Sequence, residues 1–253
     1  LYRMNSDNER LLIHMASLYK QIGEPKDALE LLDEISRKSK KSRPDIALQK
    51  AIVLWEMGEM DKASKAFIYL YQKNPNSYRL KYLAGLAYEN TEKYPQALEL
   101  FEALEKSPQF FKPARIRRAV VLGKIKDHAK AIALIRDLQK VDTKSDPELF
   151  LLVAEFQSEM GRPQDSISTM KEAIKIQPDS LNFYFFLGVY QEKAGLIDDC
   201  VASMKKVISI DPKYSAAYNY IGYLYAESNQ KLLEAKSLVE HALVLKPMHA
   251  RLN

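Results

Sequence analysis

The chain has 253 residues with a formal net charge of +5, and 47% of its residues are hydrophobic. This hydrophobic content is sufficient for a buried core, which excludes an intrinsically disordered chain. No uninterrupted apolar stretch reaches about 18 residues, so the sequence contains no candidate transmembrane helix.

Small side chains recur along the chain at intervals of 34 or 35 residues, and a hydrophobic residue follows each of them four positions later. In chain order, the small residues are Ala28, Ala63, Ala97, Ala131, Ser166, Cys200 and Ala235. A period of this length is typical of stacked helical hairpins. It predicts seven units at about residues 9–43, 44–77, 78–111, 112–146, 147–180, 181–214 and 215–248, with residues 249–253 beginning a further helix.

Glycine and proline agree with this division. All eleven prolines fall where a predicted helix begins or ends, so none interrupts a helix. Four glycines lie five residues before the small residue of their unit, where the first helix must stop and turn: Gly23, Gly58, Gly161 and Gly195. Three others lie twelve or, for Gly222, thirteen residues before it, where a missing side chain lets two helices approach closely: Gly85, Gly188 and Gly222.

The seventh unit shows the family pattern most completely, with Tyr218, Ile221, Gly222, Tyr225, Ala235, Val239, Ala242 and Pro247. These residues resemble the tetratricopeptide repeat (TPR), and the resemblance covers essentially the whole chain. It implies an all-α fold, a right-handed superhelical α-solenoid of about seven antiparallel helix pairs, forming a single domain over residues 1–253.

Three residues depart from the pattern or carry reactive chemistry. Lys50 and Arg118 replace the usual apolar residue one position before the small residue of the first helix, and we expect their stems to lie on apolar surface while their charges reach water. The single cysteine, Cys200, occupies a small-residue position, which predicts a buried thiol that acts as a compact hydrophobe.

The sequence shows no sign of catalysis. It contains no phosphate-binding glycine loop, no H-E-x-x-H and no C-x-x-C, and its four histidines are scattered through different units. No pair of carboxylates stands out as an acid–base couple. We therefore predict a non-enzymatic protein without a cofactor or a metal site.

The TPR resemblance implies that the first helix of each unit lines a concave groove. Residues at three- and four-residue steps along these helices share one face, and we predict that this face holds a peptide or helix of a partner protein, with aromatic side chains as anchors. The alternative is that the same side chains fill contacts between adjacent helices. The predicted site comprises Leu48, Ile52, Trp55, Arg79, Tyr82, Leu86, Ile116, Arg117, Val120, Leu151, Phe185, Val189, Asn219 and Tyr223.

Two other functions stay open. Residues 112–146 contain ten Lys or Arg against four Asp, a net charge of +6, which would suit single-stranded RNA. This basic stretch is confined to one unit, so we favour a protein partner. The chain would otherwise serve as a self-association or assembly module of a larger enzyme or envelope complex.

The predictions of the organism type and of the cellular compartment depend on resemblance alone. Residues 218–223 and 233–235 are similar to repeats common in bacterial arrays, including envelope-associated lipoproteins. This similarity favours a bacterial protein in the periplasm or at the membrane over a cytoplasmic one. The polar start and the incomplete unit at residues 249–253 lead us to expect a fragment of a longer chain.

Overall fold

The computed structural model describes residues 6–39, 43–141 and 146–245, and these residues form fourteen α-helices and no strand. The chain divides into two compact units, Leu1–Asp127 and His128–Asn253. The first unit contains α1 (Ser6–Gln21), α2 (Pro25–Lys38), α3 (Pro44–Glu56), α4 (Met60–Lys73), α5 (Tyr78–Asn90), α6 (Tyr94–Leu104) and α7 (Phe111–Lys124). The second contains α8 (His128–Val141), α9 (Leu149–Glu159), α10 (Pro163–Ile176), α11 (Leu181–Lys193), α12 (Ile197–Ile210), α13 (Ser215–Glu227) and α14 (Leu232–Leu245).

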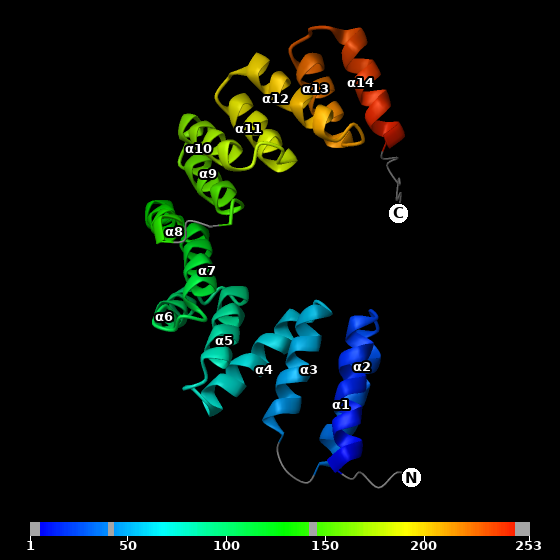
Figure 1. Ribbon diagram of the computed structural model, residues 1–253, viewed down its shortest axis with the longest axis vertical. Coiled ribbons are helices and arrows are strands. Elements are labelled where there is room, and N and C mark those ends of the chain that lie inside the picture. Colours follow the sequence, from blue (N-terminus) through cyan, green and yellow to red (C-terminus); the bar gives the residue numbers. More distant parts are fainter. Residues whose placement is uncertain (1–5, 40–42, 142–145, 246–253) are drawn as a thin grey trace. The chain divides into compact units, whose positions relative to one another are not determined.

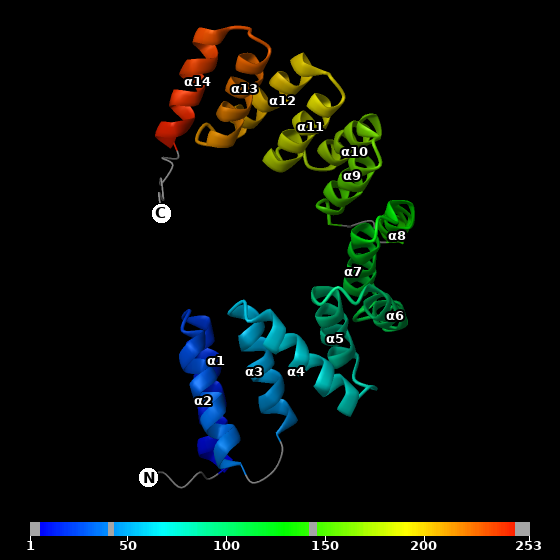
Figure 2. The ribbon, with the colours of Figure 1, turned by 180° about the vertical axis from the view of Figure 1, so that it is seen from behind.

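Within each unit the helices pack against their neighbours in chain order (Figures 1 and 2). The odd-numbered helices are the predicted first helices of the repeats, and the even-numbered helices are the second ones. The prediction of an all-α fold of paired helices is therefore confirmed. The prediction of one continuous domain over residues 1–253 stays a prediction.

Each turn within a repeat contains at least one residue in the left-handed conformation, and the turn of the seventh repeat has a second one, Lys231 at φ 45°. Four of the turns use glycine, with φ between 72° and 85°, at Gly23, Gly58, Gly161 and Gly195. The equivalent turns without glycine place Glu92, Lys126 and Asn229 at φ values of 57°, 65° and 53°. Since a side chain strains this conformation, the predicted role of the glycines is confirmed, and the other three turns adopt it at some cost.

The small residue of each repeat and the large residue four positions later lie on one face of the second helix, and this face contributes to the core. All seven small residues are buried, and so are six of the seven that follow them: Leu32, Phe67, Phe101, Ile135, Met170 and Met204. Two of the large side chains, Phe101 and Met204, lie against a glycine of the first helix. A Cβ atom on Gly85 would lie 2.6 Å from Phe101 Cε1, and one on Gly188 would lie 2.8 Å from Met204 Cε. The predicted close approach of the helices is therefore confirmed at these glycines.

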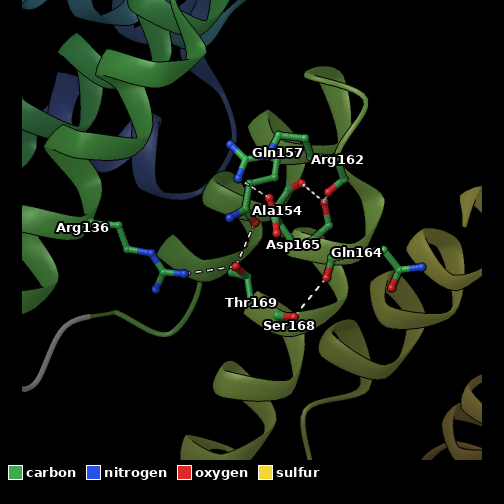
Figure 3. Close-up of polar contacts among 9 residues, drawn as sticks. Arg136, Ala154, Gln157, Arg162, Gln164, Asp165, Ser168 and Thr169 are labelled. Atoms are coloured by element: carbon green, nitrogen blue, oxygen red, sulfur yellow. Dashed lines mark hydrogen bonds and ion pairs between the residues drawn. The ribbon is translucent and has the colours of Figure 1, made fainter.

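Buried and half-buried polar side chains join the two helices of a repeat in the second unit. The hydroxyl of Thr169 in α10 donates to Oε1 of Gln157 in α9 at 2.8 Å. Arg136 of α8 in turn donates to the same hydroxyl at 3.0 Å, so that three helices meet at Thr169 (Figure 3). One repeat further on, Ser203 donates to Gln191 at 2.6 Å in the same relative positions.

The two charged departures from the family pattern have partners on the preceding second helix. Lys50 of α3 forms an ion pair with Asp33 of α2. Arg118 of α7 pairs with Glu102 at 2.7 Å and with Glu105 at 3.1 Å, and Glu102 lies in α6. Their charges therefore link successive repeats in addition to reaching water.

Cys200 is buried and free, as predicted. Burial, and then the nearby Glu192 carboxylate, raise the pKa of its thiol to about 12. The thiol is therefore protonated at pH 8, and we expect iodoacetamide to modify it only after the chain unfolds. Mass spectrometry of native and guanidinium-unfolded protein measures this difference. Equal rates of modification in the two states would contradict the prediction.

Candidate functional site

The fourteen predicted site residues lie on α3, α5 and α7 in the first unit and on α9, α11 and α13 in the second, and we call the side of each first helix that carries them its first-helix face. None of them is buried: Arg79, Asn219 and Tyr223 are exposed, and the other eleven are half-buried. Residues between them on the same helices, such as Val53, Ala87 and Val153, are buried. The predicted residues are therefore less buried than these neighbours, but eight of the fourteen still pack against the hydrophobic cores.

The predicted aromatic anchors differ in how accessible they are. Trp55 packs on Phe67 with ring centroids 5.8 Å apart, and Tyr82 packs on Phe101 at 5.9 Å. Phe185 contacts the rings of Tyr214 and Tyr220 at 5.7 and 5.9 Å. These three half-buried rings contribute to helix packing. Tyr223 is different, because 56% of it is exposed.

A cleft of about 300 Å³ opens between α9 and α11, and we call it the α9–α11 cleft. The predicted residues Leu151 and Val189 line it, and so does Phe186, which is 37% exposed. Phe185 is not among the lining residues. The prediction omitted Phe186, although it included Arg117, which occupies the same place in its own repeat. The signal that could have found it is an apolar or aromatic residue at the same place in other repeats, as at Leu83 and Tyr220.

Acidic side chains border this cleft. Glu155 is exposed and makes no ion pair within the described residues, whereas Oε2 of Glu159 lies 3.2 Å from Nε2 of His128. Burial, and then these two carboxylates, raise the pKa of the Tyr190 phenol far above its usual range. Lys193 donates to Ser158 Oγ at 3.0 Å. The α9–α11 cleft thus combines an apolar floor with a partly uncompensated acidic edge.

Comparisons with known proteins identify the family. Models described as tetratricopeptide repeat match residues 48–110 and 181–214. This chain is a tetratricopeptide-repeat protein. No curated protein matches the TPR chain in sequence.

Solved structures share the TPR fold. A tetratricopeptide repeat protein from Parabacteroides merdae is 14% identical with a TM-score of 0.73, covering 94% of this chain and 99% of that one. The C-terminal part of a TPR repeat-containing protein from Cytophaga hutchinsonii is 15% identical with a TM-score of 0.66, covering 94% and 96%. A TPR protein from Thermus thermophilus is 17% identical with a TM-score of 0.51, covering 72% and 98%. At these identities the likeness shows the fold alone.

Polar contacts connect the first helices of consecutive TPR units near their C-terminal ends. Lys20 of α1 pairs with Glu56 of α3 at 2.9 Å, and Glu89 of α5 pairs with Lys124 of α7 at 2.8 Å. Glu89 is only 7% exposed, and the guanidinium of Arg117 lies 3.7 Å from it. The charge of the predicted site residue Arg117 is therefore already partly compensated.

At least five of the nine Lys and Arg residues that the structure describes in the fourth TPR unit pair with carboxylates. In the described residues between 112 and 141, ion pairs join Arg117 and Lys124 to Glu89, Arg118 to Glu102 and Glu105, Arg136 to Glu172, and Lys140 to Asp137. Paired cations attract phosphates less, which weakens the RNA interpretation. Residues 142–145 lie outside the described part of the chain.

Two further findings concern only the described residues. No group of three or more His, Cys, Asp or Glu side chains among them could hold a metal ion. None of the helices that the structure describes has the length and apolar character needed to cross a membrane.

Proposed function

We propose that this TPR protein is a non-enzymatic scaffold that holds a segment of a partner protein on its first-helix face. The TPR fold commonly mediates protein–protein interactions. The observation that carries the proposal is the α9–α11 cleft, where Leu151, Phe186 and Val189 line an open apolar floor. A large partly exposed ring beside aliphatic side chains is the usual composition of a binding hot spot.

The energetics favour an apolar side chain in this cleft. Burial of apolar surface contributes about 25 cal/mol per Å² before the ordering costs of association are subtracted. The carboxylates of Glu155 and Glu159 lie at the edge of the same cleft and favour a partner segment with basic residues beside its apolar side chain. Charges at such a rim affect orientation and association rate more than affinity.

Affinity capture from a cell extract tests the proposal when the wild-type chain is compared with Phe186→Ala. We expect the partner's affinity to fall about 30-fold, which corresponds to about 2 kcal/mol. Ile176→Ala is the matched control, because Ile176 is an exposed apolar residue on the second helix α10. It should retain the partner at wild-type affinity, and both variants should keep the wild-type circular dichroism spectrum.

Two outcomes would contradict the proposal. Retention of the same proteins at the same affinity by Phe186→Ala would show that the α9–α11 cleft is not used. Recovery of the chain itself as the sole captured protein would indicate self-association instead of a foreign partner.

A further inference from the structure

A second cleft, of about 470 Å³, lies in the first unit at the ends of α3, α4 and α5, and we call it the α3–α5 cleft. This volume is within the range of about 300–1,000 Å³ that ligand sites occupy. Leu48, Leu70 and Leu80 give it an apolar lining, and the ring of Tyr69 stands beside them, 56% exposed. Lys73 and Arg79 line the same cleft.

The two cations that line this cleft, Lys73 and Arg79, are not compensated by carboxylates of the described residues. Within the described part of the chain, Arg79 is exposed and makes no ion pair. The ammonium of Lys73 makes no ion pair there either, and it lies 5.5 Å from the centroid of the Tyr69 ring in a cation–π contact. The acidic residue that lines the cleft, Asp45, is already held by Arg43 at 2.9 and 2.7 Å. The α3–α5 cleft therefore presents two available cations beside an apolar surface.

We propose that the α3–α5 cleft binds an acidic segment of a partner protein. One large apolar side chain of that segment fills the space against Leu48, Leu70 and Leu80, and neighbouring carboxylates pair with Lys73 and Arg79. Nucleic acid fits less well, because it has no aliphatic side chain and because Lys73 lies over the Tyr69 ring on which a base would stack. The inference rests on the proposed function only in taking a polypeptide as the ligand.

The test uses the full chain and a fluorescein-labelled peptide of eight residues, with Leu-Phe at its centre and three Glu on each side. Fluorescence anisotropy measures its affinity. We expect Lys73→Glu and Arg79→Glu each to weaken binding about tenfold or more, because a cation that attracts the peptide becomes an anion that repels it. Lys65→Glu is the matched control, since Lys65 is exposed on the same helix α4 and does not line the cleft.

Four results would overturn the inference. The first is no binding of the peptide. The second is equal affinity for a peptide with Ser-Ser in place of Leu-Phe, and the third is an equal loss in Lys65→Glu. The fourth is tighter binding of a twelve-nucleotide oligouridylate that depends on Lys73 and Arg79. The variant Phe186→Ala should bind the acidic peptide normally, so a failure here is distinguishable from a failure of the proposed α9–α11 cleft.

Discussion

Replacing Phe101 with alanine is expected to lower the free energy of unfolding of the first unit by about 3–5 kcal/mol. Phe101 is completely buried between α5 and α6, with its ring over Gly85 and 5.9 Å from the ring of Tyr82. Its removal leaves a cavity that the helix pair cannot close, because Gly85 has no side chain to fill it. Urea unfolding followed by the fluorescence of Trp55, the single tryptophan, reports on this unit.

The same contact predicts that Gly85→Ala also destabilises the unit, here through overpacking instead of a cavity. The new methyl group would lie 2.6 Å from the Phe101 ring, so we expect overpacking to destabilise the unit by about 1–3 kcal/mol. Gly188→Ala is the matched control, because its methyl group meets the flexible end of Met204, which can move aside. That variant should stay within about 1 kcal/mol of wild type, since alanine also favours the helix. A larger loss in Gly188→Ala than in Gly85→Ala would contradict this explanation.

Features determined within one repeat could be predicted from the sequence. The small residues, the large residues four positions later and the turn glycines each recur at a fixed interval, and the structure buries or positions them accordingly. The polar pair of Gln157 and Thr169 could also have been predicted from the sequence, because Gln191 and Ser203 repeat its twelve-residue spacing.

Features that depend on how repeats meet could not be predicted. The pairing of Arg118 with Glu102 and the exposure of Phe186 beside half-buried Phe185 both follow from the angle between successive helix pairs. The spacing of residues along one helix does not determine that angle. For the same reason the sequence identified a face of the first helices but not the two clefts that open on it, and Arg79 was distinguishable from paired Arg117 only in the structure.

The largest effect of a polar substitution is expected at Thr169, where α8, α9 and α10 meet (Figure 3). Thr169 is 1% exposed, and valine has nearly its shape but neither donates nor accepts a hydrogen bond. Thr169→Val therefore leaves Gln157 Oε1 without its donor and removes one acceptor from Arg136. We expect a loss of about 1–3 kcal/mol in the free energy of unfolding, measured by urea titration with circular dichroism.

Two further variants separate the hydrogen bonds from the change in shape. Ser168→Ala removes the neighbouring exposed hydroxyl, which donates to the Gln164 carbonyl at 3.0 Å, and it should change stability by less than about 0.5 kcal/mol. The double variant Gln157→Leu with Thr169→Val should recover part of the loss, because removing both partners leaves no unsatisfied amide oxygen. If Thr169→Val were as stable as Ser168→Ala, the buried polar contacts would not be what couples these three helices.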